Sequence, residues 1–272
     1  MKHGPIGILD SGLGGLTALR SLRTLLPEED VVFLGDTARL PYGGRSQAQL
    51  RQFGQQGVDF LLRQGVKAVL IACGTLSANL EPAFFGRFSV PVWGVIEPTV
   101  CAAARQSAGR IGVIATEASI RAGAYQRALR AQRPDGRVTA VACPSFVPLI
   151  ESGRTEPRDP AVREAVSREL APFVQQPVDT LILGCTHFPL LREAIADLLP
   201  ETALIDAGDA AAHDCAFQLA QRGLLNPSGA GKNTFFVTGD KAAFAKNGGA
   251  FLGESLKEVL SAALPSESGD NA

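Results

Sequence analysis

The segment Leu181-Ile182-Leu183-Gly184-Cys185-Thr186-His187 is the part of this chain from which its fold can best be predicted. An apolar run typical of a buried strand ends there in a glycine, and a thiol, a hydroxyl and an imidazole follow side by side. The apolar run Val69–Ala72 ends in the same manner in Cys73-Gly74-Thr75, and the two cysteines are 112 residues apart. We therefore predict two strands whose ends bring two thiols to one shared substrate.

The strand-like runs around these two cysteines recur in the same order in both halves of the chain. Strands that alternate with helical stretches form mainly parallel sheets, so we predict an α/β fold of two similar domains related by a pseudo-twofold axis. Parallel sheets bind ligands at the carboxyl ends of their strands, which places the expected active site in the cleft between the domains. The offsets are confined to 105–112 residues, and the matched runs begin at Ile6 and Ile111, Val31 and Val138, Ala68 and Thr180, and Pro91 and Ala203.

The segment after Asp206 has no counterpart in this repeat. It contains a fifth strand-like run, Thr234–Thr238, which we expect to return to the first domain and to make that domain discontinuous. We also expect a last helix around Leu252–Leu260 and a disordered tail over residues 266–272. The predicted domains are residues 1–97 together with 208–265, and residues 98–207.

Helical periodicity predicts further elements between the strands. Apolar residues at helical spacing indicate helices over Thr17–Leu26 and Ala210–Arg222. A longer helix is expected over Ser46–Gln64, with Ser46 as its N-cap.

The composition is that of a globular protein, with 46% hydrophobic and 19% charged residues in 272. A net charge of −1 gives no electrostatic reason to expect nucleic acid or an anionic membrane surface as a partner. No apolar run reaches the roughly 18 residues that a membrane-spanning helix needs. The beginning of the chain lacks a signal-peptide pattern, so we expect a cytoplasmic protein.

The glycine-rich loop Asp10–Gly15 follows the first predicted strand and precedes a predicted helix, an arrangement that suits anion binding. It does not match the dinucleotide fingerprint, because Thr17 occupies the position of the third glycine. We interpret the loop as a cradle for a carboxylate with Asp10 at its lip. The alternative is that Asp10 only caps the turn.

Taken together, the motifs of this chain resemble those of the glutamate racemases, within the aspartate/glutamate racemase superfamily. The matching motifs occur in family order between residues 8 and 191, so the resemblance covers most of the chain. They are Ile8–Gly15, Gly35-Asp36-Thr37, Pro41-Tyr42-Gly43, Cys73-Gly74-Thr75, Gly94–Pro98, Pro148–Gly153 and Gly184–Leu191.

The resemblance implies a cofactor-independent, two-base interconversion of L- and D-glutamate that supplies D-glutamate for peptidoglycan. By this resemblance Cys73 and Cys185 are the catalytic thiols, and Asp10, Glu151 and His187 are the supporting acid–base residues. It further implies a cytoplasmic homodimer without a metal. The implied substrate contacts are Asp10, Ser11, Tyr42, Gly43, Gly74, Thr75, Thr186 and His187.

Two thiols suit this chemistry because racemisation removes a proton from one face of Cα and returns a proton to the opposite face. A free cysteine has a pKa of about 8.5, which neighbouring groups can adjust. We expect one thiolate and one thiol in the substrate complex, with His187 assisting Cys185 and Asp10 assisting Cys73. Donors from Ser11, Thr75, Thr186 and loop N–H groups are expected to stabilise the charge that develops on the substrate carboxylate.

One position departs from the family pattern. An asparagine commonly follows the first cysteine in the family, and here Gly74 takes its place. The amide that would contact substrate is therefore missing, although the backbone N–H of Gly74 can still serve. This departure leaves substrate specificity open.

Other residues have simpler interpretations. The five cysteines include no CxxC pair, which disfavours a zinc site or a disulfide framework. We expect packing roles for Cys101 and Cys215, no catalytic role for Cys143, and a core position for Trp93. The acids Asp36, Glu97 and Asp206 each follow a strand and are either loop caps or acids of the site.

Two alternative functions remain open at this stage. Another racemase of the superfamily, acting on aspartate or a hydantoin, would share the paired cysteines. A non-catalytic two-lobed amino-acid-binding protein would share the cleft. Pyridoxal phosphate chemistry is disfavoured because neither Lys67 nor another lysine lies in a recognisable context for it.

Overall fold

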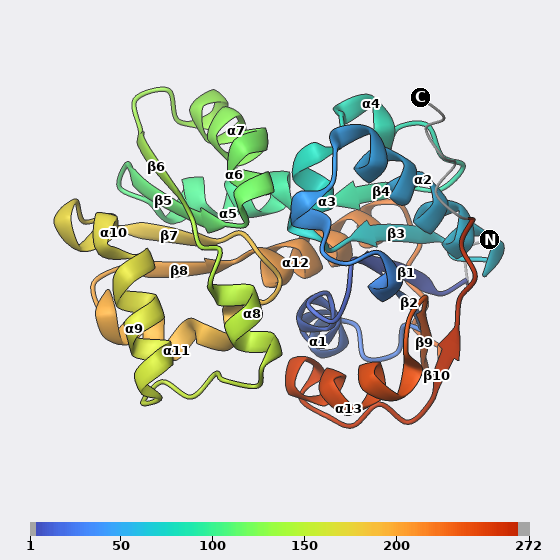
Figure 1. Ribbon diagram of the computed structural model, residues 1–272. Helices are drawn as coiled ribbons and strands as arrows, with labels where there is room; N and C mark the ends of the chain where they lie inside the picture. The colour runs from blue at the N-terminus through green and yellow to red at the C-terminus, as the bar shows by residue number, and fades with distance from the viewer. Residues whose placement is uncertain (1–3, 266–272) are drawn as a thin grey trace, which may run out of the picture.

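The computed structural model describes residues 4–265, which fold into two lobes, each built on its own parallel sheet (Figure 1). The tail predicted over residues 266–272 lies outside the described residues. The two lobes confirm the predicted α/β fold with two similar halves.

The first sheet has six strands in the order β10-β9-β2-β1-β3-β4, and every neighbouring pair is parallel. Its central strands are apolar except for Asp10 at the end of β1 and are buried on both faces, as expected for a parallel sheet covered by helices. The strands are β1 (Ile6–Asp10), β2 (Val31–Gly35), β3 (Ala68–Ile71), β4 (Val92–Gly94), β9 (Asn233–Val237) and β10 (Val259–Ser261).

The second sheet has four parallel strands in the order β6-β5-β7-β8. This order repeats β2-β1-β3-β4 of the first sheet, with each strand of the second half in the place of its predicted counterpart. The repeat seen in the sequence is thus a repeat of topology. The strands are β5 (Arg110–Ala115), β6 (Arg137–Ala142), β7 (Thr180–Leu183) and β8 (Ala203–Asp206).

Helices occupy most of the connections between strands. In the first half they are α1 (Leu16–Leu25), η1 (Thr37–Arg39), η2 (Tyr42–Gly44), α2 (Gln47–Arg63), α3 (Gly74–Asn79), α4 (Pro82–Phe85) and α5 (Ile96–Gln106). In the second half they are α6 (Glu117–Ala122), α7 (Ala124–Gln132), α8 (Phe146–Glu151), α9 (Pro160–Glu169), α10 (Ala171–Gln175), η3 (Phe188–Leu191) and α11 (Arg192–Leu198). The last two are α12 (Ala207–Gln221) and α13 (Lys241–Leu252).

The predicted cap at Ser46 is confirmed. The Ser46 hydroxyl accepts the backbone N–H of Gln49, and the Gln49 side chain accepts the backbone N–H of Ser46. This reciprocal capping box satisfies two backbone donors that the first turn of α2 would otherwise leave unpaired. Local sequence alone therefore fixes where this helix begins.

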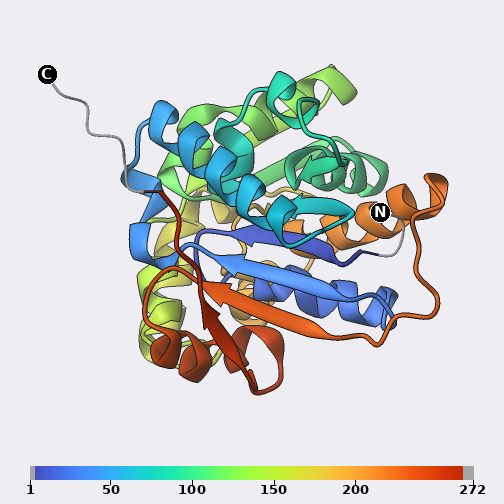
Figure 2. The ribbon, with the colours of Figure 1, turned by 90° about the vertical axis from the view of Figure 1, so that its right-hand side faces the viewer.

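The chain crosses between the lobes through α5 and returns through α12. Strand β9 then pairs with β2, and the two strands lie side by side in Figure 2. The fifth strand therefore joins the first sheet, as predicted. Helix α12 packs against both α1 and α5, which ties the crossing segments to the first lobe. The exact boundaries of the domains stay a prediction.

The prediction of a last helix over Leu252–Leu260 is wrong. Helix α13 ends at Leu252, and Val259–Ser261 forms strand β10 beside β9. Two caps set the limits of α13: the Asp240 carboxylate accepts two backbone N–H groups at its start, and Gly253 adopts a left-handed φ of 89° at its end. The apolar residues after Gly253 instead extend the free edge of the sheet.

Side chains of the first sheet alternate between two apolar cores. Ile6 and Ile8 of β1 point into one core and Leu9 into the other, following the twofold side-chain period of a strand. The first core continues through α5 and α12 into the second lobe, where it includes the β7 residues Leu181 and Leu183. Shared apolar packing therefore joins the two lobes.

Candidate active site

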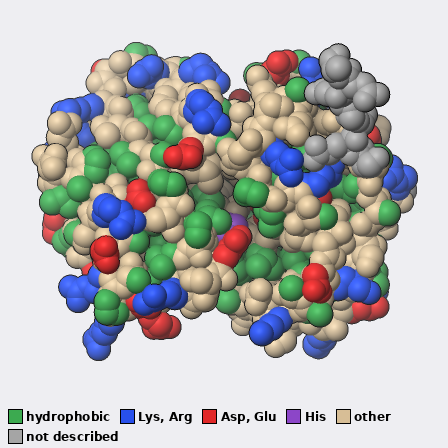
Figure 3. Space-filling model, in the orientation of Figure 1, with side chains coloured by type: hydrophobic (Ala, Val, Ile, Leu, Met, Phe, Trp, Pro, Cys, Tyr) green, Lys and Arg blue, Asp and Glu red, His purple; other side chains and the backbone are tan. Residues whose placement is uncertain are grey.

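The carboxyl ends of β1, β3 and β7 carry the residues singled out from the sequence. Asp10 is the last residue of β1, and Cys73 and Cys185 each lie two residues beyond the end of their strand. The front face of the molecule is hollowed along the junction of the two lobes, and a histidine side chain is visible in this hollow (Figure 3).

Cys73 is the N-cap of the short helix α3. Its sulfur accepts the backbone N–H of Leu76 at 3.4 Å and lies 3.5 Å from the Ser11 hydroxyl oxygen. Burial raises the pKa of this thiol to about 12, and the nearby charge of Asp10 adds to the effect. Because of this burial and this nearby charge, Cys73 holds its proton at neutral pH.

The carboxyl group of Asp10 is completely buried below the glycine-rich loop. Its Oδ2 accepts the backbone N–H of Gly12 at 2.9 Å, so Asp10 does cap the turn. Its Oδ1 has no hydrogen-bond partner among the described residues. Burial raises the pKa of Asp10, against the opposing effects of Gly12 and the charge of His187. Capping the turn therefore occupies one carboxyl oxygen of Asp10 and leaves the other available to the site.

In the second lobe, the side chain of His187 lies between those of Cys185 and Glu151 and contacts both. The imidazole Nδ1 of His187 lies 4.0 Å from the Cys185 sulfur, and its Nε2 lies 3.1 Å from a Glu151 carboxylate oxygen. Burial by itself would lower the pKa of His187, but the contacts with Cys185 and Glu151 and the charge of Asp10 raise it to about 10. The ring is therefore an imidazolium at neutral pH, and its positive charge lies beside the Cys185 sulfur.

The two cysteine loops touch each other across the junction of the lobes. A Cβ atom on Gly74 would lie 2.4 Å from the Gly184 carbonyl oxygen, and one on Gly14 would lie 2.1 Å from the Thr186 hydroxyl. These approaches leave no room for a side chain at either glycine. The lobes are therefore in backbone contact beside both thiols.

Two hydroxyl contacts accompany this close approach. Thr17 on α1 donates to the Thr186 carbonyl oxygen at 3.1 Å. The hydroxyls of Thr75 and Thr116 are 3.0 Å apart. Each contact joins a residue of the first lobe to one of the second, so polar contacts as well as backbone packing hold the junction closed.

Tyr42 is held by a buried carboxylate. Its hydroxyl donates to Asp36, which also accepts Arg39 Nε at 2.6 Å and the Thr238 hydroxyl at 2.8 Å. The Tyr42 ring packs on Phe53, with ring centroids 5.3 Å apart. Burial, followed by the charge of Asp36, raises the pKa of Tyr42, so the phenol stays protonated. Asp36 therefore acts as a buried anchor for the loop that carries Tyr42.

The comparison with known proteins gives the family. A family model described as Asp/Glu/Hydantoin racemase matches residues 16–215. The chain belongs to this racemase family. It is 45% identical over 242 residues to a glutamate racemase of Thermus thermophilus, covering 88% of this chain and 89% of that relative. It is 40% identical to a glutamate racemase of Desulforudis audaxviator, covering 97% and 99% of the two chains.

Solved structures give the same result. A glutamate racemase from Thermus thermophilus in complex with β-chloro-D-alanine superposes with a TM-score of 0.88 at 42% identity, covering 96% of this chain and 98% of that one. One from Francisella tularensis in complex with D-glutamate superposes with a TM-score of 0.90 at 34% identity, covering 97% and 98%. The chain is thus an amino-acid racemase of the glutamate racemase type.

The structure also shows where the remaining residues singled out from the sequence of this racemase lie. Asp206 is the N-cap of α12, where its carboxylate accepts the N–H groups of Gly208 and Asp209. Glu97 lies in the first turn of α5. Cys143 and Cys215 are buried, and burial raises the pKa of both thiols, which suits packing.

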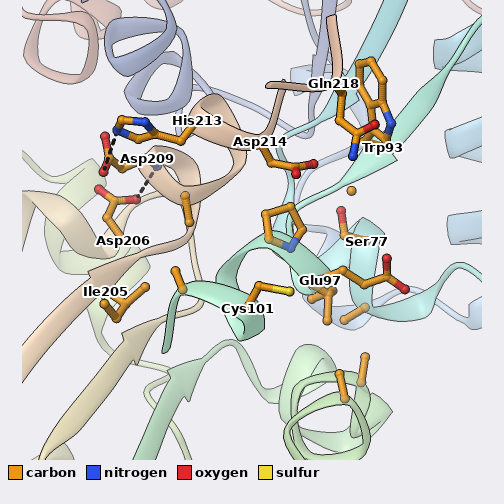
Figure 4. Close-up of a pocket in the computed structure, with 18 of the residues that line it drawn as sticks. Ser77, Trp93, Glu97, Cys101, Ile205, Asp206, Asp209, His213, Asp214 and Gln218 are labelled. Carbon is orange, nitrogen blue, oxygen red and sulfur yellow. Dashed lines mark hydrogen bonds and ion pairs between the residues drawn. The ribbon is translucent and has the colours of Figure 1, made fainter. Parts of the chain in front are cut away.

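A large cavity lies away from the two paired cysteines. It has a volume of about 1370 Å³ and is lined by residues of α5 and α12 among others (Figure 4). None of the predicted catalytic or substrate-contacting residues lines it, but Glu97 and Asp206 do. Trp93, expected in the core, is only partly buried and lines this cavity, as does Cys101. The indole is wide enough to cover core residues with one part while the rest faces the cavity.

Residues that the sequence interpretation missed also reach the site. Thr17, Thr116 and Phe251 contact the cysteine loops or their partners. In the sequence, Thr17 occupies the position of the absent third glycine and begins a predicted helix, neither of which indicates a contact with the site. Nothing in the local sequence marks Thr116 or Phe251. Between residues 4 and 265, no group of three or more His, Cys, Asp and Glu residues could hold a metal ion. No helix in the same range is long and apolar enough to cross a membrane.

Proposed function

We propose that Cys73 and Cys185 racemise glutamate by acting on opposite faces of its Cα. The observation that supports this is that each thiol ends an equivalent strand of its own lobe and has its own acid–base partner. In one direction a thiolate removes the Cα proton and becomes a thiol, and the other thiol donates its proton to the opposite face and becomes a thiolate. Each proton is transferred directly between Cα and a cysteine side chain, so the proposal needs no cofactor.

The two thiols are not equivalent before substrate binds. Burial and the charge of Asp10 keep Cys73 protonated, whereas the protonated ring of His187 lies 4.0 Å from the Cys185 sulfur. We therefore assign Cys185 as the base and Cys73 as the acid of the resting site. Binding the enantiomer that places its Cα hydrogen toward Cys73 requires a proton to move from Cys73 to Cys185 first.

The main barrier is the weak acidity of the Cα–H group of the substrate. Hydrogen-bond donors must therefore stabilise the substrate carboxylate as negative charge develops on it. The Ser11 hydroxyl lies 3.5 Å from the Cys73 sulfur, and Thr75 and Thr186 follow the two cysteines within two residues in the chain. We propose these three residues as the donors. Deleting one preorganised donor typically costs about 3–4 kcal/mol of transition-state stabilisation. Asp10, Tyr42, Gly43, Gly74 and His187 stay predicted substrate contacts.

The substrate assignment is tested by measuring optical rotation with L-glutamate, D-glutamate and L-aspartate separately. Turnover of both glutamate enantiomers with little turnover of aspartate supports the proposal, and turnover of aspartate alone contradicts it. Exchange of the Cα proton in D₂O separates a racemase from a protein that only binds the amino acid.

The thiol roles are tested by Cys73→Ala and Cys185→Ala. Each variant removes the acid–base group of one face, so racemisation is expected to fall by at least about 10²–10⁴-fold in both directions. Near-normal turnover in either variant would show that the two-thiol mechanism is wrong. Cys143→Ala is the matched control, because this buried thiol also follows a strand of the second lobe and has no proposed role.

The wider role follows the family. We propose that the D-glutamate supplies peptidoglycan synthesis, and that the protein acts in the cytoplasm as a homodimer. Light scattering during size-exclusion chromatography tests the dimer, since the monomer mass is 28.5 kDa. Rescue of a D-glutamate auxotroph tests the cellular role.

A further inference from the structure

The imidazole of His187 touches the ring of Phe251, a residue from the opposite lobe. The two ring centroids are 5.2 Å apart and the ring planes meet at 81°, an edge-to-face contact. Phe251 belongs to α13, which leads into β10 of the first sheet, whereas His187 follows β7 of the second. Figure 1 shows α13 below α1, facing the second lobe.

The polar contacts of His187 are made through its two ring nitrogens, with Nδ1 4.0 Å from the Cys185 sulfur and Nε2 3.1 Å from Glu151. The Glu151 side chain is 42% exposed, so solvent competes for this contact. The torsion that turns a histidine ring has a broad energy profile, so packing decides the ring orientation. Gly14 borders the ring at Nδ1, and Phe251 supplies the large rigid surface against it.

Phe251 is itself held firmly. Its side chain is only 2% exposed, and α13 packs against α1. A Cβ on Gly248 of α13 would lie 3.0 Å from a Leu16 methyl group, so the two helices are close together at this level. The position of the phenyl ring is thus set by the core of the first lobe, independently of His187.

We propose that Phe251 is a positioning residue that orients His187 toward Cys185 when the two lobes are together. This inference rests on the proposed acid–base role of His187. When the first lobe closes on the second, the phenyl ring limits the rotation of the imidazole and keeps Nδ1 directed at the sulfur. The acid–base partner of Cys185 is then aligned by a ring that the opposite lobe supplies.

The test compares Phe251→Leu with Phe244→Leu. Phe244 lies on the same helix with the same 2% exposure, but it packs on Phe33 at 6.0 Å between ring centroids. Both variants lose one core ring, so similar decreases in Tm are expected. Only Phe251→Leu should lower kcat/KM, by about ten- to hundredfold, because a misplaced acid–base group costs rate.

The decrease in kcat/KM of Phe251→Leu must be equal for L-glutamate and D-glutamate, because the two enantiomers have the same free energy. Equal kcat/KM in the two leucine variants would overturn the proposal. If Phe251→Leu does not fold, Phe251→Met, which fills much of the same volume without a ring, takes its place.

A second measurement does not depend on activity. The chain has three histidines, so the ring ¹⁵N signals of His187 can be assigned by their loss in His187→Asn. We expect these signals to shift or broaden in Phe251→Leu and to stay unchanged in Phe244→Leu. Unchanged His187 signals in Phe251→Leu would overturn the proposed contact even if racemisation is confirmed. A wild-type protein that fails to racemise glutamate would instead contradict the proposed function and leave this comparison intact.

Discussion

Gly74 lies directly against Gly184, so that a Cβ atom on Gly74 would come within 2.4 Å of the Gly184 carbonyl oxygen. Each glycine adjoins one of the two cysteines, and the contact therefore sets how closely the thiol-bearing loops approach. The position where the family commonly has asparagine is, in this chain, a point of backbone contact between the lobes.

This contact predicts that Gly74→Ala and Gly74→Asn both lower kcat/KM, by about ten- to hundredfold, because the added Cβ forces the cysteine loops apart. Gly86→Ala is the matched control, since a Cβ there meets nothing within 4 Å. Steady-state assays with both enantiomers measure the effect. Higher activity in Gly74→Asn than in the wild type would mean that the missing amide matters more than the close approach.

The hydrogen bond that Thr17 makes across the junction of the lobes predicts a smaller effect on catalysis. The Thr17 hydroxyl lies 3.1 Å from the Thr186 carbonyl and 2.8 Å from the Gly14 carbonyl, so its single proton has one acceptor in each lobe. Thr17→Val removes one hydrogen bond, worth about 0.5–1.5 kcal/mol, and should lower kcat/KM about two- to tenfold.

Thr24→Val is the control for Thr17→Val. Thr24 lies on the same helix, and its hydroxyl bonds only within that helix, to the Arg20 carbonyl. A kcat/KM for Thr17→Val that equals that of Thr24→Val would show that the bond between the lobes does not support catalysis.

The raised pKa of His187 predicts a pH-dependent stability. Between its usual pKa of about 6.5 and its native value of about 10, the folded protein binds a proton that the unfolded chain has lost. The stabilisation is complete below about pH 6.5 and disappears as the pH rises toward 10. The groups that face the ring are Cys185, Glu151 and Asp10.

Urea unfolding between pH 6.5 and 9 measures this linkage. The wild type should lose stability across the range, and His187→Gln should lose less. Cys73 adds a similar loss only above about pH 9, because burial raises its pKa from an ordinary value near 9. Parallel stability curves for the two proteins below pH 9 would contradict the assignment of a protonated His187.

The three hydrogen bonds that the buried Asp36 accepts predict that removing its charge destabilises the fold around the loop that carries Tyr42. Asp36→Asn places an amide against the donors of Tyr42, Arg39 and Thr238, and should cost about 1–3 kcal/mol of unfolding free energy. Asp59→Asn is the control, because Asp59 accepts a bond only from Gln55 on its own helix. Equal losses in the two variants would show that Asp36 does not anchor the loop.

A double-mutant cycle then tests the pairing of Asp36 with Tyr42. The combined effect of Asp36→Asn and Tyr42→Phe should be smaller than the sum of the single effects, because both remove the same hydrogen bond. Strict additivity would mean that the two side chains stabilise the fold independently.

The strand ends were predictable because their signals are local. Each strand that leads to a cysteine is a continuous apolar run that stops at the polar residues around Cys73 or Cys185, and the recurrence of the runs predicts two similar halves with mainly parallel sheets. The capping box at Ser46 was equally local. The prediction of the last helix is wrong because Leu256 and Leu260 follow a helical spacing from Leu252, whereas the left-handed Gly253 ends the helix before them.

By itself, the sequence determined the two-lobed α/β fold and the positions of both thiols at strand ends, since side-chain periodicity and strand length act over a few residues. Only the tertiary structure decided which residues face those thiols. Gly184 reaches Gly74, Thr186 reaches Thr17, and His187 reaches Phe251. These pairs are far apart in the chain, and their contacts depend on how α5 and α12 pack the lobes together, which no local pattern encodes.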